Sequence, residues 1–175
     1  MLKILLKFSA QSFLIFIVII TIGGFGHFFI VEPTEVEGRS MENFLFDKDI
    51  IVIEKMYLLF SSPRRGQTIS VLDEENNILL VKRIVALPGE TVTIRDGKIF
   101  LINANGTEWQ LEENYLSADI MTLPANGEAT TSYPTLAKNE YFIMGDNREH
   151  STDSRNYGPV HRNKIVGVVR KLFSK

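Results

Sequence analysis

Residues 12–31 form a run of twenty residues, SFLIFIVIITIGGFGHFFIV, that contains no Asp, Glu, Lys or Arg. A helix rises about 1.5 Å per residue, so a run of this length matches the hydrocarbon thickness of a bilayer. The run contains Gly23, Gly24 and Gly26, and glycine is tolerated in membrane helices. We therefore expect one transmembrane anchor over residues 10–31, followed by one further domain.

The charges on either side of this run predict its orientation. Lys3 and Lys7 precede it, whereas Glu32, Glu35 and Glu37 follow it. The positive-inside rule then puts the N-terminus, residues 1–9, in the cytoplasm. It puts residues 32–175 outside the cytoplasm, in a protein of the cell membrane that crosses it once. A cleaved secretory signal is the competing interpretation, but its apolar core is shorter and ends in a small-x-small site that is missing here.

The composition of the rest of the chain excludes several classes of function. Residues 32–175 hold 21 acidic and 17 basic residues, so no nucleic-acid partner is expected. The chain has no cysteine, which excludes disulfides, a thiolate nucleophile and cysteine metal ligands. Its three histidines, His27, His150 and His161, lack the spacing of metal ligands. We expect neither a metal nor any other cofactor.

Short β-branched runs recur after the apolar segment, separated by turn residues. Seven of them are candidate strands: 49–53, 68–72, 78–85, 91–94, 98–102, 140–144 and 165–169. Asp96-Gly97, between two of these runs, is a strong hairpin signal. Residues 103–137 have weak periodicity and are interpreted as an insertion or small cap. The pattern predicts a mainly β fold, with a barrel-like antiparallel β catalytic domain preceded by one transmembrane helix.

Three clusters carry the candidate chemistry. Gly38-Arg39-Ser40-Met41 begins shortly after the apolar run. Residues 81–90 read VKRIVALPGE. Residues 145–158 read GDNREHSTDSRNYG.

In their order and spacing, these clusters resemble the successive motifs of type I signal peptidases, which are membrane-anchored serine endopeptidases with a Ser/Lys dyad. The resemblance runs from the anchor to about residue 170 and leaves only residues 103–137 without a distinctive match. It implies that Ser40 is the nucleophile and Lys82 the general base. It also implies that Ser151 orients Lys82.

General chemistry is consistent with these implied roles. A serine hydroxyl is a weak nucleophile and needs a base to take its proton. Lysine serves as that base only when neutral, and burial lowers its pKa. The apolar residues around Lys82 suit such burial. Without the surrounding motifs, the alternative is that neither residue is catalytic. Ser40 would then be an ordinary serine of a loop, and Lys82 would lie on the solvated face of a strand. Asp146, Arg148, Asp153 and Arg155 are expected to form a charge-assisted network that holds their loop near the dyad.

The chain departs from the family pattern close to Ser40. Relatives usually continue Ser-Met with x-Pro-Thr-Leu, whereas this chain has Glu42-Asn43-Phe44-Leu45. Gly38 stands where many relatives carry a serine that donates to the oxyanion. The backbone N–H of Ser40 is therefore expected to stabilise the oxyanion.

The resemblance implies removal of signal peptides from exported preproteins at the outer face of the cytoplasmic membrane, after a small-x-small site. The extended substrate would add as a strand beside Lys82–Ala86 or beside Glu35–Arg39. Membrane lipid is the other expected partner. One alternative is a catalytically weak or specialised relative that assists assembly of surface proteins. Another, a self-cleaving repressor with the same chemistry, is disfavoured by the anchor and by the lack of a DNA-binding segment.

Overall fold

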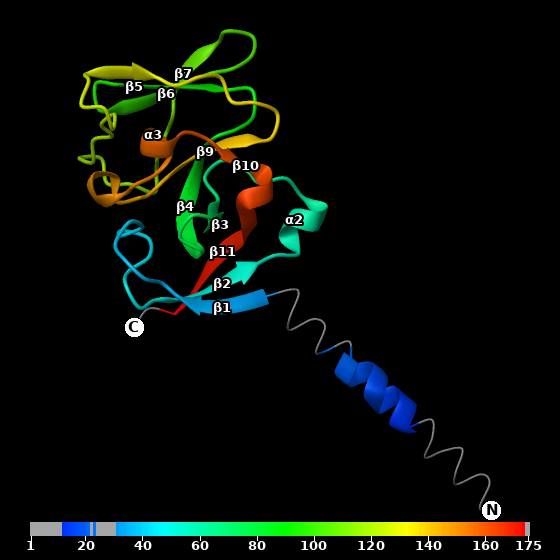
Figure 1. Ribbon diagram of the computed structural model, residues 1–175. Coiled ribbons are helices and arrows are strands. Elements are labelled where there is room, and N and C mark those ends of the chain that lie inside the picture. The colour runs from blue at the N-terminus through cyan, green and yellow to red at the C-terminus, as the bar shows by residue number, and fades with distance from the viewer. Residues whose placement is uncertain (1–11, 22, 24–30, 174–175) are drawn as a thin grey trace, which may run out of the picture.

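The computed structural model describes residues 12–21, 23 and 31–173. Residues 12–21 are helical and their side chains are exposed. Within the described part of the chain, no helix has both the length and the apolar character needed to cross a membrane. The rest of the predicted anchor, and the predicted cytoplasmic segment 1–9, lie outside the described residues. From Val31 onward the chain folds into two antiparallel sheets (Figure 1).

The larger sheet has seven strands in the order β1-β2-β11-β3-β4-β9-β10. Their bounds are β1 Val31–Glu35, β2 Ile50–Glu54, β3 Thr68–Asp73, β4 Ile78–Ala86, β9 Glu140–Met144, β10 Val160–His161 and β11 Ile165–Phe173. Strand β11 is last in sequence but lies between β2 and β3, and it pairs with both. Among the described residues, strand pairing therefore connects the β1–β2 hairpin to β3 and β4 only through β11.

The smaller sheet has four strands in the order β7-β6-β5-β8. Their bounds are β5 Thr91–Arg95, β6 Lys98–Ile102, β7 Glu108–Gln110 and β8 Thr130–Ser132. Asp96 and Gly97 join β5 to β6 with φ angles of 51° and 72°. These positive angles are those of a type I′ turn, which matches the twist of the two strands it joins.

Four short helices complete the fold. They are α2 Tyr57–Phe60, the 3₁₀ turn η1 Arg148–His150, α3 Ser154–Tyr157 and the 3₁₀ turn η2 Arg162–Lys164. In α2, Tyr57 and Leu58 pack against the core, whereas Leu59 and Phe60 are exposed. The side chain of Asp153 caps α3 by accepting from the Arg155 N–H.

The prediction of a mainly β, antiparallel fold is confirmed, and each of the seven predicted strands is present. Neither sheet closes on itself within the described residues, so barrel-like closure stays a prediction. The segment 103–137 contributes β7 and β8, which lie at the two edges of the smaller sheet.

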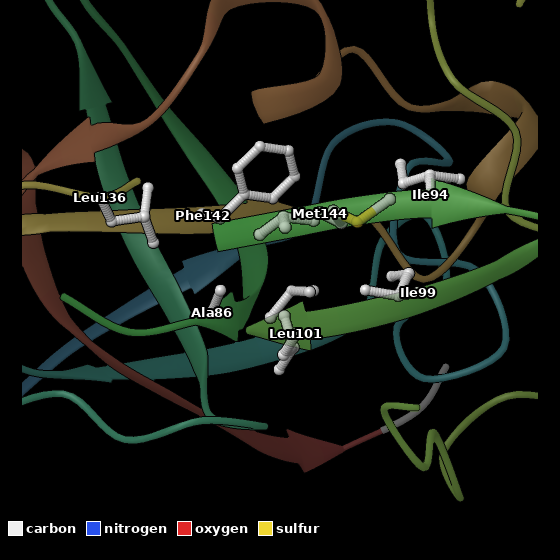
Figure 2. Packing of buried hydrophobic residues seen from close by; sticks show 9 residues of the cluster. Ala86, Ile94, Ile99, Leu101, Leu136, Phe142 and Met144 are labelled. Carbon is white, nitrogen blue, oxygen red and sulfur yellow. The ribbon is translucent and has the colours of Figure 1, made fainter. Parts of the chain in front are cut away.

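One buried cluster joins the two sheets. Ile94, Ile99 and Leu101 of the smaller sheet pack with Ala86 of β4 and with Phe142 of β9 (Figure 2). The alternating residues Ile84 and Ile143 point into a second cluster on the other face of the larger sheet. Because β4 contributes to both clusters, packing on both faces fixes the strand that carries Lys82.

Candidate active site

Ser40 lies in the loop between β1 and β2, and two buried side chains hold this loop in place. Met41 and Leu45 are almost fully buried and pack with Ile51, Ile53 and Val169. The carbonyl of Met41 accepts from the N–H groups of Phe44 and Leu45, at 3.1 and 2.8 Å. Met41 follows Ser40 directly, so the burial of Met41 sets the direction of the chain at Ser40.

Lys82 lies in β4, opposite Ile69 of β3, and its side chain is buried. Its Nζ lies 2.7 Å from Ser40 Oγ, which is hydrogen-bond distance. The structure therefore brings together the two candidate catalytic residues, 42 positions apart in the sequence. A neutral amine at this distance is within reach of the hydroxyl proton.

The surroundings of Lys82 favour the neutral amine. Burial lowers the pKa of Lys82 from 10.5 to about 8, because a buried ammonium loses its hydration. The negative charge of Asp153 raises this pKa, and the positive charge of Arg155 lowers it. Near neutral pH an appreciable fraction of Lys82 is therefore the neutral amine.

Gly145 lets the end of β9 approach Ser40 closely. A Cβ atom at this position would lie 2.4 Å from the Ser40 carbonyl oxygen and 2.3 Å from Ser151 Oγ. Both distances are far below van der Waals contact, so any side chain here would push the two segments apart. Glycine is required at this position by the lack of space.

Ser151 lies beside Gly145, and its Oγ atom is buried. Within the described part of the chain, this atom has no hydrogen-bond partner of good geometry. Its hydroxyl contributes to the lowering of the Asp153 pKa. That Ser151 orients Lys82 stays a prediction.

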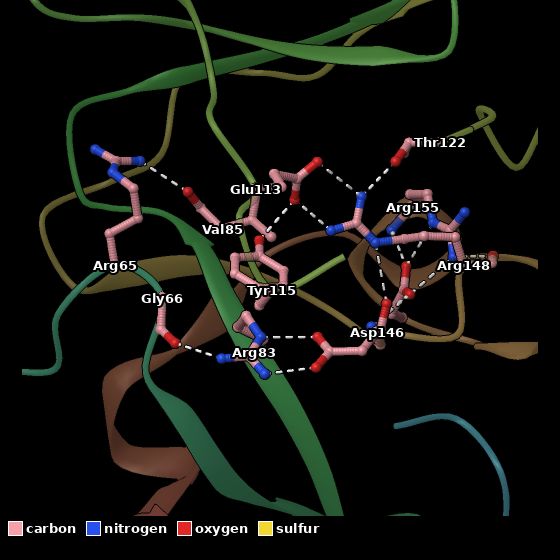
Figure 3. Close-up of polar contacts among 12 residues, drawn as sticks. Arg65, Gly66, Arg83, Val85, Glu113, Tyr115, Thr122, Asp146, Arg148 and Arg155 are labelled. Atoms are coloured by element: carbon pink, nitrogen blue, oxygen red, sulfur yellow. Dashed lines mark hydrogen bonds and ion pairs between the residues drawn. The ribbon is translucent and has the colours of Figure 1, made fainter. Parts of the chain in front are cut away.

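Arg83, next to Lys82, forms a buried ion pair with Asp146. Its Nε and Nη2 donate to the two carboxylate oxygens of Asp146 at 2.7 and 2.5 Å, and its Nη1 donates to the carbonyl of Gly66 (Figure 3). The guanidinium also lies over the rings of Tyr115 and Phe44, 4.1 and 5.1 Å from their centres. Phe44, which departs from the family pattern, thus packs on this ion pair.

Two more arginines hold the loop that follows β9. Arg148 is buried and pairs with Glu113, and it also donates to Thr122 Oγ1 and to the carbonyl of Gly145 (Figure 3). The Arg155 Nε and Nη2 atoms each lie 2.9 Å from a carboxylate oxygen of Asp153. Asp153 also accepts from the N–H of Gly145 at 3.1 Å.

Asp153 is charged although it is buried. Burial raises the pKa of this carboxyl, but hydrogen bonds and charge from Arg155 outweigh burial and hold the pKa below its usual value. Asp153 is therefore ionised at neutral pH. Its charge counters, in part, the effect of burial on the pKa of Lys82.

All four residues of the expected network make charge-assisted contacts near the dyad, but four other residues of the site were not predicted. Arg83 stands in the second motif, next to Lys82, and no role was predicted for it. Glu113 and Tyr115 come from the segment without distinctive patterning, where no local signal marks them. Asn147, described further below, stands in the third motif.

Among the described residues, no group of three or more His, Asp or Glu side chains is arranged to hold a metal ion.

Comparisons with known proteins show the family of this chain. The family model described as signal peptidase, peptidase S26, matches residues 9–173. Signal peptidase I of Bacillus licheniformis is 31% identical over 146 residues, which cover 83% of this chain and 77% of that protein. Signal peptidase I P of Bacillus subtilis subsp. natto is 35% identical over 149 residues, with the same coverage of both chains.

A crystal structure of signal peptidase I from Enterococcus faecalis is 31% identical, covers 62% of this chain and 97% of that one, and has a TM-score of 0.46. The family match extends over nearly the whole chain and includes both Ser40 and Lys82. The chain therefore belongs to the signal peptidase family, peptidase S26, and is a serine peptidase.

Proposed function

We propose that this protein removes signal peptides from exported preproteins with Ser40 as nucleophile and Lys82 as general base. The observation that carries the proposal is the 2.7 Å contact between Ser40 Oγ and the buried Nζ of Lys82. Neutral Lys82 accepts the hydroxyl proton while Ser40 Oγ attacks the scissile carbonyl. Lys82 then gives this proton to the leaving amine, and water hydrolyses the acyl-enzyme.

The unpaired strand edges near Ser40 support recognition of an extended substrate. Arg83, Ile84 and Ala86 pair with β9, so the expectation of a substrate strand along Lys82–Ala86 is wrong for most of that segment. Within the described residues, Ile78–Lys82 pairs with β3 alone, and β1 forms an edge of its sheet. A peptide bound at these edges would present alternate side chains to one face, as selection for a small-x-small site requires.

The proposed location is the outer face of the cytoplasmic membrane. The charge-free run 12–31 supports an anchor, and Lys3 and Lys7 support a cytoplasmic N-terminus. The relatives named signal peptidase I support exported preproteins as the substrates. Cleavage after a small-x-small site belongs to the same proposal.

The test uses the full chain in detergent with a preprotein whose signal ends in Ala-x-Ala. Ser40→Ala and Lys82→Ala should each abolish cleavage, because the two residues act as one unit. Lys82→Arg should also be inactive, because a guanidinium does not lose its proton at useful pH. Circular dichroism should show all three variants folded.

Ser70→Ala is a matched control. Ser70 lies in β3, is fully buried and pairs with Val81 rather than with Lys82, so Ser70→Ala removes a buried hydroxyl of the same sheet and leaves both dyad residues in place. This control should retain activity. Turnover by either Lys82 variant would exclude Lys82 as the base. A wild-type protein that binds preproteins but never cleaves them would support the alternative role in assembly.

A further inference from the structure

One residue, Asn147, holds both peptide groups that flank Ser40. Its backbone N–H donates to the Ser40 carbonyl at 3.1 Å, and its side-chain Nδ2 donates to the Arg39 carbonyl at 3.1 Å. The first bond fixes the peptide group after Ser40, and the second fixes the peptide group before it.

The second of these bonds has a consequence for the N–H of Ser40. This N–H belongs to the same planar, trans peptide group as the Arg39 carbonyl, so the two point in opposite directions. A carbonyl held by Asn147 therefore directs the Ser40 N–H away from Asn147. Within the described part of the chain, no protein acceptor takes up this N–H. It is left available for the oxyanion.

Glu42 fixes the orientation of the Asn147 side chain. Its Oε2 accepts from the Asn147 Nδ2 at 3.1 Å, and its Oε1 accepts from the Arg39 Nε at 2.7 Å. An amide NH₂ group has two hydrogens, and here it donates one to the Arg39 carbonyl and the other to the Glu42 carboxylate. The hydrogen bond from Arg39 is the main cause that lowers the pKa of Glu42, so this carboxylate is charged at neutral pH.

We propose that Asn147, oriented by Glu42, is a positioning residue that aims the Ser40 N–H at the oxyanion. The inference rests on the proposed function of Ser40 as nucleophile. In this proposal, neither the Asn147 nor the Glu42 side chain contacts the substrate. Each acts through the peptide group between Arg39 and Ser40.

The electrostatics of the reaction explain why this orientation matters. A donor aimed at the oxyanion stabilises charge that develops only in the transition state, and loss of one such donor costs about 10²–10³ in rate. Gly38 offers no side-chain donor, so the Ser40 N–H supplies a larger share of the stabilisation of the oxyanion in this protein. A misaligned N–H lowers kcat, and it leaves substrate binding largely unchanged because the ground state lacks this charge.

The first experiment compares Asn147→Asp and Glu42→Gln with the unchanged full chain in detergent, with the Ala-x-Ala preprotein as substrate. Asn147→Asp has the same shape but loses the donor, so kcat should fall at least tenfold while KM stays within about twofold. Glu42→Gln keeps the shape and loses the charge, and kcat should fall about threefold. Asn103→Asp is the control, because Asn103 also holds a loop, through the N–H groups of Asn105 and Thr107, away from the dyad.

The second readout is the affinity for a peptide aldehyde that ends in Ala-x-alaninal. Such an aldehyde forms a hemiacetal with Ser40, and its oxygen occupies the place of the oxyanion. Its inhibition constant should rise in Asn147→Asp by the same factor by which kcat/KM falls. The affinity of the matching peptide amide, which forms no hemiacetal, should stay the same. A purely structural defect would weaken both ligands.

The outcomes separate this inference from the proposed function. If the protein cleaves through Ser40, but Asn147→Asp and Glu42→Gln keep full kcat and full aldehyde affinity, the positioning role is wrong and the proposed function stands. If Ser40→Ala still cleaves, both are wrong. Should Asn147→Asp fail to fold, as judged by circular dichroism, Glu42→Gln decides alone, because its carboxylate is partly exposed and outside the core.

Discussion

As the proposed base, Lys82 meets two requirements that oppose each other. It must be buried enough to lose its proton near neutral pH, and it must still reach Ser40. Its place on β4 meets both, because the strand is packed on each face and Nζ still lies 2.7 Å from Ser40 Oγ. The ionised Asp153 keeps the pKa of Lys82 from falling further. Burial and the charges of Asp153 and Arg155 together set the pKa of Lys82.

This balance predicts how activity depends on pH. The folded pKa of Lys82 is lowered to about 8, so the residue is protonated below that pH and cannot accept the Ser40 proton. We expect kcat/KM to rise about tenfold per pH unit below pH 8 and to level off above it. Cleavage rates between pH 5 and 10 would measure this profile.

His150 is the chief alternative base, because it stands next to Ser151 and histidine is the commonest general base. His150→Ala should keep the inflection at the same pH. If the inflection disappears in this variant while activity persists at low pH, Lys82 is not the base.

The loop that carries Ser40 turns in a way that the usual family sequence would not allow. Asn43 has a φ angle of 91°, which asparagine tolerates better than most residues do. Proline, which relatives usually carry at this position, is fixed near −65°. The departure from the family pattern is therefore part of a different turn, in which Glu42 reaches Asn147.

Substitutions at Asn43 test this turn. Asn43→Gly should keep activity within about twofold, because glycine adopts positive φ freely. Asn43→Pro should lose at least tenfold in kcat/KM and about 3 kcal/mol of unfolding free energy, although it restores the family residue. Cleavage assays and urea denaturation measure the two effects. Equal activity of the two variants would show that the backbone angle at this position is unimportant.

The sequence predicted the strands that have their own local signal. Alternation and turn residues located seven strands, and Asp96-Gly97 located the β5–β6 hairpin. The four missed strands lack such signals. Strand β8 is three polar-rich residues, and β1 contains Pro33. These strands form because they pair with strands elsewhere in the chain: β8 pairs with β5, and β1 pairs with β2. Proline is tolerated in β1 because β1 is an edge strand.

The residues of the candidate site also differ in whether the local sequence marks them. Ser40 and Lys82 stand in distinctive motifs, so the sequence singled them out. Their supporting contacts depend on geometry across the fold. Arg148 reaches Glu113 across 35 positions, and Asn147 reaches Glu42 across 105. Nothing in the local sequence of Glu113 or Glu42 marks it as a partner, so the structure was needed to identify both.

The seven-stranded sheet has two halves that meet at β11. One half, β1 and β2, carries the Ser40 loop, and the other, β3 and β4, carries Lys82. Gly167 lets β11 lie close to β2, because a Cβ atom there would be 2.5 Å from Ile53 Cγ2 and 3.0 Å from the Glu54 carbonyl oxygen. The distance between Ser40 and Lys82 therefore depends on how closely β11 packs against β2.

Gly167→Val should push β11 away from β2. Overpacking of this kind costs about 1–3 kcal/mol, so we expect a lower midpoint of urea denaturation. We also expect kcat/KM to fall, because the two halves of the sheet separate. Arg170→Val is the matched control in the same strand, since Arg170 is exposed and its ion pair with Glu54 contributes little. A Gly167→Val variant as stable and active as the original would show that close packing here is unnecessary.

The position of β11 also has a consequence for biosynthesis. A growing chain that has reached residue 160 already contains Ser40, Lys82, Asp146 and Asp153, but it lacks the strand that joins the two halves of the sheet. We therefore expect the dyad to reach its final geometry after residues 165–171 have been made and have paired with β2 and β3. On the proposed function, a nascent chain that lacks β11 should show no proteolytic activity. The order of the strands would thus delay activation until β11 has been made.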